Sequence, residues 1–547
     1  MKKIMTYIMA GCMALSMNSC LDLEPTSELV DNNFWKNKEQ FSAFNVGLQG
    51  LFRQKGYQLI ELGELRSNIY AGTPFSGESP SGYSEIYNNM LSTTNTGISD
   101  FAGFYTTINQ INLMIDKCNN TSLLTDAEKN KYLGNAYGMR AFFYLQLLKS
   151  YGKAVINTVH TEGGTLDLNN TAREESTAEE VMAQIKEDIK ASEDAFNGDY
   201  TFNDSRNGWS LAATKMLKGD AYLWSGNQIE TEKAKQNSDF EVAKQAYQDI
   251  INAKVASLES NYSDVFAFNN KCNKEIIFAI YNGENETALW NGQYSNTLVM
   301  NQQNMGGYGL YDYDTDGYIY FKDSELAKGS GIMRVSLNKN LYDGENYASR
   351  LFRDGDTRFL GSMREVYSTK TNDWPYVGVI ANKFHGTMLA GKSVISWLDD
   401  QPIYRYSECL LGLAEAKVLL GEDPTEEINA VRKRAYGETY FYAHPEIQYP
   451  NDTDEDTTEG DDESASNEDK VNFYTNNPFV GSDADPEEAV LKERCREFMF
   501  EGKRWYDIRL FNKATKYSTA VESRLYWPID QNALGENSKL NQTDGYK

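Results

Sequence analysis

The chain has 547 residues, of which 40% are hydrophobic and 13% aromatic, and its formal net charge is −26. The length allows either several average domains or one large domain with a sizeable core. The acidity argues against nucleic acid as a partner, because phosphates require a basic footprint, and it disfavours a basic lipid-binding face. The 36 Tyr and 8 Trp favour a binding surface of amphipathic rings, although many tyrosines would also line helix interfaces.

The N-terminus has the pattern of a lipoprotein signal. Lys2 and Lys3 precede a mostly apolar stretch at 4–17 that is too short to span a bilayer. The stretch ends in Ser19-Cys20, a small residue directly before a cysteine. The pattern predicts a signal peptide over 1–19 and a lipid on Cys20, which would anchor the mature chain to a membrane. Ordinary secretion with a free Cys20 is the alternative.

Helical periodicity dominates the remainder of the chain. A helix is predicted to open at Phe34-Trp35 and to continue to about Phe52, followed at 61–100 by a Ser-, Gly-, Thr- and Asn-rich region typical of functional loops. Thr125 followed by Glu128 reads as a helix cap. The other predicted helices lie at 104–118, 125–152, 176–196, 210–226, 239–253, 405–421 and 426–437.

Several of these helices are expected to pack as pairs. Small residues at Ala212, Ala213, Gly219 and Ala221 would let a partner helix approach closely, as in tetratricopeptide repeats. The repeats are degenerate and far apart, so they predict a scaffold within one domain, over about 30–253, 401–437 and 486–515. The fold class is therefore mainly α, a tetratricopeptide-like helix-pair scaffold with loop-rich insertions and little β-structure.

Two insertions interrupt this scaffold. The first, at 254–400, combines many aromatic residues with Gly and Asn and contains short β-like runs such as 275–280. The second is the acidic segment at 452–470, where ten of the 19 residues are Asp or Glu, so that self-repulsion predicts a mobile solvated loop. The four cysteines beyond Cys20 fit no metal-binding spacing, and we expect mostly buried free thiols.

The stretch at 491–511 is predicted to form one helix with an apolar stripe. On its other side Glu493, Glu497 and Glu501 recur every four residues, where like charges repel. Such a row often pairs with basic residues elsewhere in the chain, and Arg432, Lys433 and Arg434 are candidates. A solvated acidic face is the simpler interpretation.

One segment has the spacing of a calcium loop. Asp312, Asp314 and Asp316 precede Gly317, and Asp323 stands at the twelfth position, which fits the oxygen-rich turn that calcium prefers. Asp323 replaces the usual Glu, and no helices clearly flank the loop, so an Asp/Gly turn without metal is the simpler reading. No cofactor is required by any other pattern.

No pattern in the sequence indicates a catalytic site. The three histidines lie outside any zinc-protease or triad-like string, and no nucleophile elbow or phosphate-binding loop is present. A pair of glycosidase carboxylates separated in sequence is not excluded by reading alone. We therefore predict a protein that is not an enzyme.

Several strings together resemble a known family. They are the CLDLEP start after the signal, the Arg140–Tyr144 helical core, RDGDTRF at 353–359, RYSECLLGLAEA at 405–416 and the EF-x-FEG-x-RWYD helix near the C-terminus. In this order they resemble the SusD/RagB family of outer-membrane nutrient-binding lipoproteins. The resemblance covers most of the chain, and the acidic segment at 452–470 is its main departure.

The resemblance implies a function and partners. SusD-like proteins are non-enzymatic lipoproteins on the outer face of the outer membrane that cover a SusC-like TonB-dependent transporter and capture glycans or, in the RagB branch, peptides. Residues 20–547 are accordingly expected to form a single domain, and this domain is expected to bind oligosaccharide. A peptide-binding lid and a surface glycoside hydrolase remain the alternatives.

The ligand residues of the family lie outside its recognisable motifs, so candidates come from the Gly- and Asn-rich loop regions. Aromatic rings there could stack on sugar faces, and an arginine could bond hydroxyls. The predicted ligand-binding residues are Arg66, Tyr70, Tyr83, Trp290, Tyr294, Tyr311 and Trp374.

Overall fold

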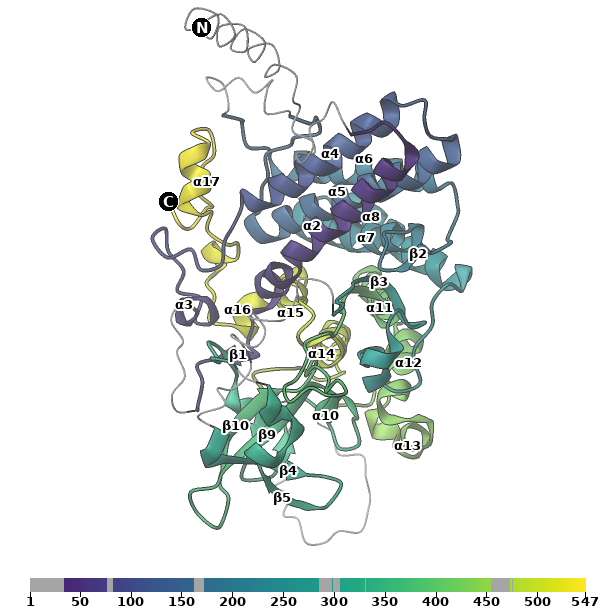
Figure 1. Ribbon diagram of the computed structural model, residues 1–547. Helices are drawn as coiled ribbons and strands as arrows, with labels where there is room; N and C mark the ends of the chain where they lie inside the picture. The colour runs from purple at the N-terminus through teal and green to yellow at the C-terminus, as the bar shows by residue number, and fades with distance from the viewer. Residues whose placement is uncertain are drawn as a thin grey trace, which may run out of the picture.

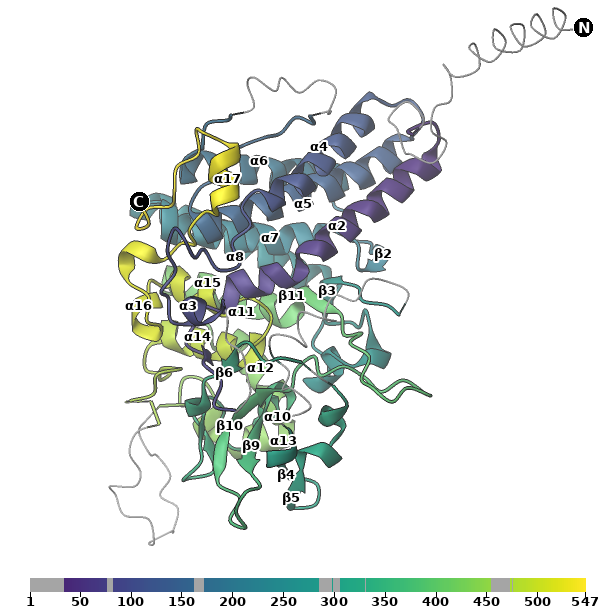
Figure 2. The ribbon, with the colours of Figure 1, turned by 60° about the vertical axis from the view of Figure 1, so that its left-hand side comes forward.

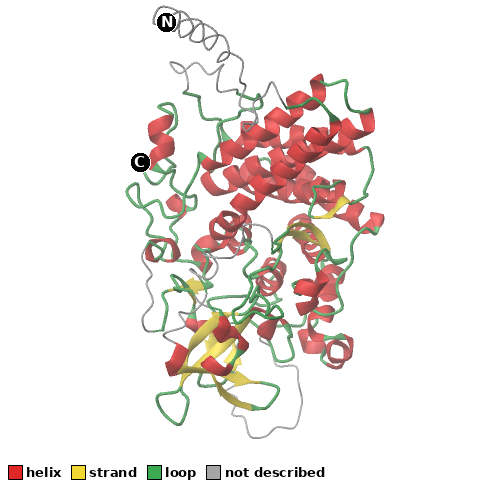
Figure 3. Cartoon of the chain, viewed as in Figure 1, coloured by secondary structure: helices red, strands yellow, loops and turns green. Residues whose placement is uncertain are grey.

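Long helices form one end of the molecule and a small β-sheet lies at the other, as both views of the ribbon show (Figures 1 and 2). Coloured by secondary structure, the chain is mainly helical, and its largest group of strands is confined to the sheet end (Figure 3). The computed structural model describes residues 34–75, 82–161, 172–284, 298, 305–329, 331–453, 473–474 and 476–547.

Most helices of the N-terminal half lie close to their predicted positions, but the first continues to Glu64, beyond its predicted end at about Phe52, and a short helix lies in the predicted loop region at 61–100. The helices of this half are α2 (Lys38–Glu64), α3 (Ser84–Tyr87), α4 (Gly103–Asn120), α5 (Asp126–Tyr151), α6 (Ala178–Phe196), α7 (Leu211–Trp224) and α8 (Lys233–Ala253). The later helices are α10 (Arg358–Ser362), α11 (Tyr406–Leu420), α12 (Thr425–Tyr436), α13 (Glu438–Ala443), α14 (Pro486–Phe498), α15 (Arg504–Leu510), α16 (Ala514–Tyr517) and α17 (Gln531–Glu536). Successive helices pack together as α4–α5, α5–α6, α7–α8 and α11–α12, which confirms the predicted helix-pair scaffold.

Local signals explain where the clearest helix begins and ends. Thr125 accepts the backbone N–H of Glu128, and the Glu128 side chain accepts the N–H of Thr125, so the predicted cap of α5 is confirmed. Gly152, with φ of 76°, adopts the left-handed conformation that ends the helix without a Cβ penalty.

Small residues set the approach of helices, as predicted. A Cβ added at Gly219 of α7 would lie 2.2 Å from the ring of Tyr247, and one added at Gly412 of α11 would lie 2.5 Å from the same ring. The Tyr247 side chain of α8 therefore occupies space that only glycine leaves open on both neighbours. This contact joins the first helix pairs to α11, which follows the long insertion.

Strands are short and form four separate sheets. The largest has the antiparallel order β10-β9-β4-β5. The strands are β1 (Tyr70–Ala71), β2 (Asn203–Arg206), β3 (Ile276–Ile280), β4 (Tyr308–Asp312), β5 (Gly317–Tyr320), β6 (Ser336–Leu337), β7 (Tyr342–Asp343), β8 (Ala348–Ser349), β9 (Met363–Ser368), β10 (Tyr376–Ala381) and β11 (Gln401–Arg405). The β-like run at 275–280 is β3, which pairs with β11.

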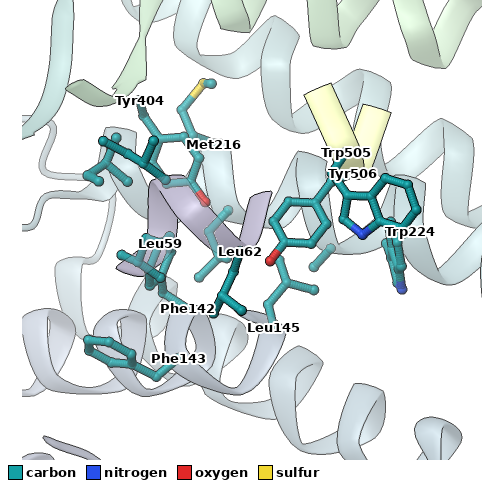
Figure 4. Packing of buried hydrophobic residues seen from close by; sticks show 14 of the residues in the cluster. Leu59, Leu62, Phe142, Phe143, Leu145, Met216, Trp224, Tyr404, Trp505 and Tyr506 are labelled. Atoms are coloured by element: carbon teal, nitrogen blue, oxygen red, sulfur yellow. The ribbon is translucent and has the colours of Figure 1, made fainter. Parts of the chain in front are cut away.

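The main core lies where the N-terminal helices meet the C-terminal signature. Figure 4 shows Leu62 of α2, Leu145 of α5 and Trp224 of α7 beside Trp505 and Tyr506 of α15. Trp505 has no exposed surface. The segment after α16 returns to the same region, where the Trp527 indole N–H donates to the carbonyl of Leu62 at 3.1 Å. The two ends of the described chain thus share one core.

The predicted single helix over 491–511 is wrong. The chain breaks between α14 and α15, where Phe500 and Gly502 have φ of 69° and 72°. The Glu64 carboxylate at the end of α2 accepts both of their backbone N–H groups, at 2.7 and 3.1 Å. A Cβ at Gly502 would lie 2.8 Å from the Cα of Ile60, so the turn depends on glycine. The partner that fixes the break lies more than 400 residues away in the sequence.

The predicted solvated face of this stretch is also wrong, whereas two of the three predicted basic partners are confirmed; the third, Lys433, lies instead over the ring of Tyr442. Glu493 and Glu497 have no exposed surface and Glu501 is 6% exposed. Arg432 donates to Glu493 at 2.9 Å, and Arg434 donates to Glu497. These pairs compensate the desolvation of the carboxylates.

Further bases complete this buried row. Arg358 donates to Glu493 at 2.6 Å and to Glu497 at 3.1 Å. Arg405 donates to Glu497 at 2.6 Å and to Glu501 at 2.9 Å. Lys383 is a third partner, of Glu501. The row therefore joins α10, β11, α12 and α14.

The acidic segment begins inside the protein. Asp452 is 2% exposed and pairs with Lys492 at 3.0 Å and with Arg496 at 3.3 Å. The predicted solvation is thus wrong for this first residue, while 454–472 lies outside the described residues. Cys118, Cys409 and Cys495 are buried free thiols, as expected, and Cys272 is half-buried.

The turn between α14 and α15 generates a first prediction. Gly502→Ala is expected to lower the free energy of unfolding by about 2–4 kcal/mol, because the new Cβ meets backbone in a left-handed conformation. Urea denaturation followed by tryptophan fluorescence measures the change. Gly535→Ala in α17 is the control, since nothing lies within 4 Å of a Cβ there. Equal effects of the two substitutions would contradict the role given to the turn.

The buried row generates a second prediction. Burial alone would raise the pKa of Glu493, but Arg358 and Arg432 outweigh it and lower the pKa from 4.5 to about 2. Glu493→Gln is expected to lower the free energy of unfolding at pH 7 by about 3–5 kcal/mol, because it leaves buried arginines under-paired.

The pH dependence of this effect has a definite sign. A carboxyl group whose pKa is lower in the folded state than in the unfolded state stabilises the fold at pH values above its unfolded-state pKa. The contribution of Glu493 is therefore present above pH 4.5 and is lost as the pH falls towards 2. Urea midpoints measured from pH 7 to pH 2 should therefore fall less steeply in Glu493→Gln than in the native protein. The exposed Glu536→Gln is the control, and parallel curves for Glu493→Gln and native protein would refute the assignment.

Candidate functional site

A cleft with a volume of ≈ 330 Å³ lies beside the sheet end of the molecule. Its walls combine aromatic rings with a few polar groups, which is typical of small-molecule sites. The lining residues are Tyr313, Tyr342, Tyr347, Ala348, Ser349, Phe352, Arg353, Asp354, Gly355, Asp356, Thr357, Phe359 and Leu360.

Three segments bring these residues together. The β7–β8 hairpin supplies Tyr342 and Tyr347, and the β4–β5 turn supplies Tyr313. The segment 353–359, which resembles a family motif, forms another wall. Gly355 has φ of 82°, and a Cβ there would lie 2.6 Å from the ring of Tyr440. The tight backbone of this wall therefore depends on glycine.

The rings differ in how much surface they leave open. Tyr347 is 63% exposed and Tyr313 is 43% exposed. Behind them, the ring of Tyr342 stacks on Phe359 with centroids 6.0 Å apart and planes 12° apart. Phe359 also meets the exposed ring of Tyr313 edge-on, with centroids 6.4 Å apart, so these rings support one apolar face of the cleft.

Two of the charged residues of the cleft wall, Asp356 and Arg353, are paired within the protein. Both carboxylate oxygens of Asp356 accept from Arg358, at 2.9 and 2.7 Å. Arg353 donates to Asp452 at 3.1 Å, and its guanidinium lies 4.0 Å from the ring centroid of Phe473. The same Arg358 and Asp452 belong to the buried ion-pair network, so this network holds the cleft wall directly.

A second aromatic surface continues along the sheet. Trp374, in the β9–β10 connection, has its ring 5.2 Å from those of Tyr318 and Tyr320 on β5. A Cβ at Gly309 of β4 would lie 2.0 Å from the Trp374 ring, so the indole packs on bare backbone. Trp374 has φ of 44°, a conformation that costs a bulky residue strain energy.

This surface connects to the cleft through Tyr311. Its ring centroid lies 5.3 Å from that of Tyr318 and 5.0 Å from that of Tyr313. The structure thus brings the predicted Tyr311 and Trp374 into one continuous aromatic surface with the cleft.

Three predicted ligand residues have structural partners elsewhere, and none lines the cleft. Arg66 has no exposed surface and donates to Asn89 at 2.8 Å and to the carbonyl of Tyr526 at 2.8 Å. Tyr70 is buried in β1, and the hydroxyl of Tyr83 donates to Glu61 at 2.8 Å. These contacts join the 61–100 region to the core.

The other predicted site residues include three that the structure does not place. Trp290, Tyr294 and the lipidation residue Cys20 lie outside the described residues. Their roles stay predictions from the sequence.

The predicted calcium residues lie at the β4–β5 turn and just after it. Asp312 accepts from the backbone N–H of Asp314 at 3.1 Å and from the hydroxyl of Thr315 at 2.7 Å, while Asp316 accepts from Tyr311. Asp323 ends a short 3₁₀ turn after β5. In the described part of the chain, no group of three or more His, Cys, Asp or Glu is placed to hold a metal ion. Calcium at this turn stays a prediction.

Sequence reasoning did not select the rings that line the cleft. Tyr347, Phe352 and Phe359 were missed, although the latter two flank or end the RDGDTRF motif. Tyr313 was noticed only as one aromatic residue among many in the insertion. Their position beside this motif was the sequence signal that could have identified these rings. The glycine of the motif and its paired Asp and Arg predict a fixed loop, and such a loop can hold aromatic rings in place.

No described helix combines the length and hydropathy needed to cross a bilayer. A family model described as "SusD family" matches residues 178–523, and another, described as "Starch-binding associating with outer membrane", matches residues 20–214. SusD-like protein P38 of Formosa agariphila is 24% identical over 580 residues, covering 97% of this chain and 96% of its own length.

Solved structures agree with these matches. NanU of B. fragilis is 46% identical, covers 96% of this chain and 100% of its own, and superposes with a TM-score of 0.85. A laminarin binding SusD-like protein is 18% identical, covers 93% of this chain and 100% of its own, and has a TM-score of 0.64, so it shares the fold alone. Because the first family model spans more than half of the 547 residues and a solved relative is 46% identical over nearly the whole chain, the protein belongs to the SusD family, a glycan-binding family associated with the outer membrane.

Proposed function

We propose that this protein captures oligosaccharide in the aromatic cleft at the cell surface and delivers it, unmodified, to a SusC-like TonB-dependent transporter in the outer membrane. The observation that carries the proposal is the cleft itself, in which Tyr347 and Tyr313 are exposed while Asp356 and Arg353 are already bound to protein partners. A lipid on Cys20 would hold the protein at the outer membrane, facing the exterior.

The cleft suits a sugar for physical reasons. The flat face of a sugar ring is apolar, so it packs on Tyr347 and Tyr313, while hydroxyls at its edge reach the polar wall. Because Asp356 and Arg353 are bound to protein partners, a neutral ligand need not displace an ion pair. Each ring contributes little, so affinity should be micromolar or weaker unless several sugars bind at once.

The continuous surface through Tyr311 to Trp374 supports binding of more than one sugar. A longer oligosaccharide that entered the cleft would reach these rings without leaving the protein. Affinity should then rise with chain length, because the second contact is intramolecular.

Two alternatives rest on specific features. The net charge of −26 would attract a basic peptide, which favours a peptide ligand of that kind. A glycoside hydrolase would need two available carboxyl groups in the cleft. Of the two aspartates in its described lining, Asp356 has both oxygens bound by Arg358, which leaves only Asp354. This arrangement supports capture over hydrolysis.

Capture is tested with the full-length mature chain and a panel of laminarin, soluble starch and mucin O-glycans. Affinity electrophoresis measures binding, and chromatography of the same samples measures products. We expect binding of at least one glycan and no products. Products would refute capture without turnover. Binding to none of the glycans would favour the peptide alternative.

The cleft is located by a matched pair of variants. Tyr347→Ala should weaken binding of the retained glycan by about three- to tenfold, because it removes an exposed stacking ring and leaves the core intact. Tyr442→Ala in α13 is the control, since Tyr442 is 60% exposed and lies outside the cleft lining. Equal losses in both variants would place the site elsewhere.

A further inference from the structure

Tyr313 stands at the edge of the cleft with its ring held by several contacts. Its hydroxyl donates to Oε1 of Glu365. The guanidinium of Arg364 lies 5.9 Å from its ring centroid, and the rings of Tyr311 and Phe359 meet it edge-on at 5.0 and 6.4 Å. A side chain that is 43% exposed is therefore fixed in one orientation.

Glu365 is an unusual residue for its position. It lies on β9, an inner strand of the four-stranded sheet, and is 1% exposed. Its Oε2 is buried without a hydrogen-bond partner in the described structure. The adjacent Arg364 donates instead to the carbonyl of Tyr311. Burying a carboxylate with one oxygen unsatisfied is costly, and an apolar residue of similar size would avoid that cost.

The stability of the fold does not account for this carboxylate. The hydrogen bond from the Tyr313 hydroxyl to Glu365 is only half-buried, on a side chain that is 43% exposed, and one such bond contributes too little to exceed the cost of the unsatisfied oxygen. The hydrogen bond that Glu365 does make goes to a ring that lines the cleft. The carboxylate therefore has its effect at the cleft.

We propose that Glu365 is a positioning residue for ligand capture, which holds the Tyr313 ring as a wall of the cleft and commits the Tyr313 hydroxyl proton to the protein. This inference rests on the proposed function of the cleft. It assigns Glu365 a role without contact to the ligand.

The proposal has a consequence for specificity. Burial raises the pKa of the Glu365 carboxyl, but its Oε1 accepts from the Tyr313 hydroxyl, so the single hydroxyl proton of Tyr313 points at Glu365. The Tyr313 oxygen then has only lone pairs to offer the cleft. A ligand must place a donor there, such as a sugar hydroxyl or an amide N–H, and a ligand that presents only an acceptor at this point is disfavoured.

Binding of laminarin, soluble starch and mucin O-glycans to variants of the full mature chain tests this role. Glu365→Leu should weaken binding by about three- to tenfold while the thermal unfolding midpoint is kept or raised, because a costly buried charge is removed. Glu365→Gln, which retains a carbonyl acceptor, should restore part of the loss. Glu345→Gln, a change of charge at the exposed turn of the β7–β8 hairpin, should have no effect.

A double substitution separates positioning from a general structural role. Tyr313→Phe keeps the ring and removes the hydroxyl, and it should weaken binding as much as Glu365→Leu does. If Glu365 acts through this hydroxyl, Glu365→Leu should add nothing in the Tyr313→Phe background. Additive losses, or no loss in Glu365→Leu, would overturn the proposal.

A readout without ligand distinguishes this inference from the proposed function. Incorporation of 3-fluorotyrosine gives a fluorine resonance for Tyr313, assigned by its loss in Tyr313→Phe. Glu365→Leu should shift and broaden this resonance, because the ring loses its fixed orientation, and an unchanged resonance would overturn the proposal. If no glycan binds, the proposed capture fails and the role in capture fails with it, while the resonance still decides whether Glu365 holds Tyr313.

Discussion

The row of carboxylates on α14 and the following turn is the constraint on which the architecture depends. Glu493, Glu497 and Glu501 are buried, and an unpaired buried carboxylate would cost several kcal/mol, so the chain must deliver bases to them. The bases come from segments far apart in sequence, among them Arg358 before β9 and Arg405 at the end of β11. Satisfying the row therefore fixes how the long insertion sits on the helical scaffold.

This constraint extends to the cleft. Arg358 binds Glu493 with one nitrogen and Asp356 of the cleft wall with others, so the wall is an outer layer of the buried network. Arg353 is tied in the same way to Asp452. Ligand binding to rings carried on such a wall loses little conformational entropy, because the wall is ordered beforehand. Rigidity of the core would thus favour the weak stacking on which the proposed capture depends.

The sequence predicted what local patterns determine. Thr125 and Glu128 lie three residues apart, and the cap that they form was predictable from that spacing. The break at Phe500–Gly502 was not predictable, because Glu64 supplies its hydrogen bonds from another helix. Composition indicated aromatic binding loops in two regions, at 61–100 and in the insertion at 254–400, and in the insertion Tyr311 and Trp374 share one surface. It could not separate them from Arg66 and Tyr70, whose burial depends on neighbours distant in the chain.

Three features that stability alone does not favour meet around the four-stranded sheet. Trp374 holds a strained left-handed backbone, Glu365 buries an unsatisfied oxygen, and Tyr347 exposes most of its ring. Natural sequences usually keep local preference and global fold in agreement, and their exceptions concentrate at functional sites. Left-handed non-glycine residues also occur among the helices, where Asn197 and Lys254 end α6 and α8, which accounts for their conformation. Trp374, Glu365 and Tyr347 end no helix, and the proposed capture of ligand by the aromatic surface would account for all three.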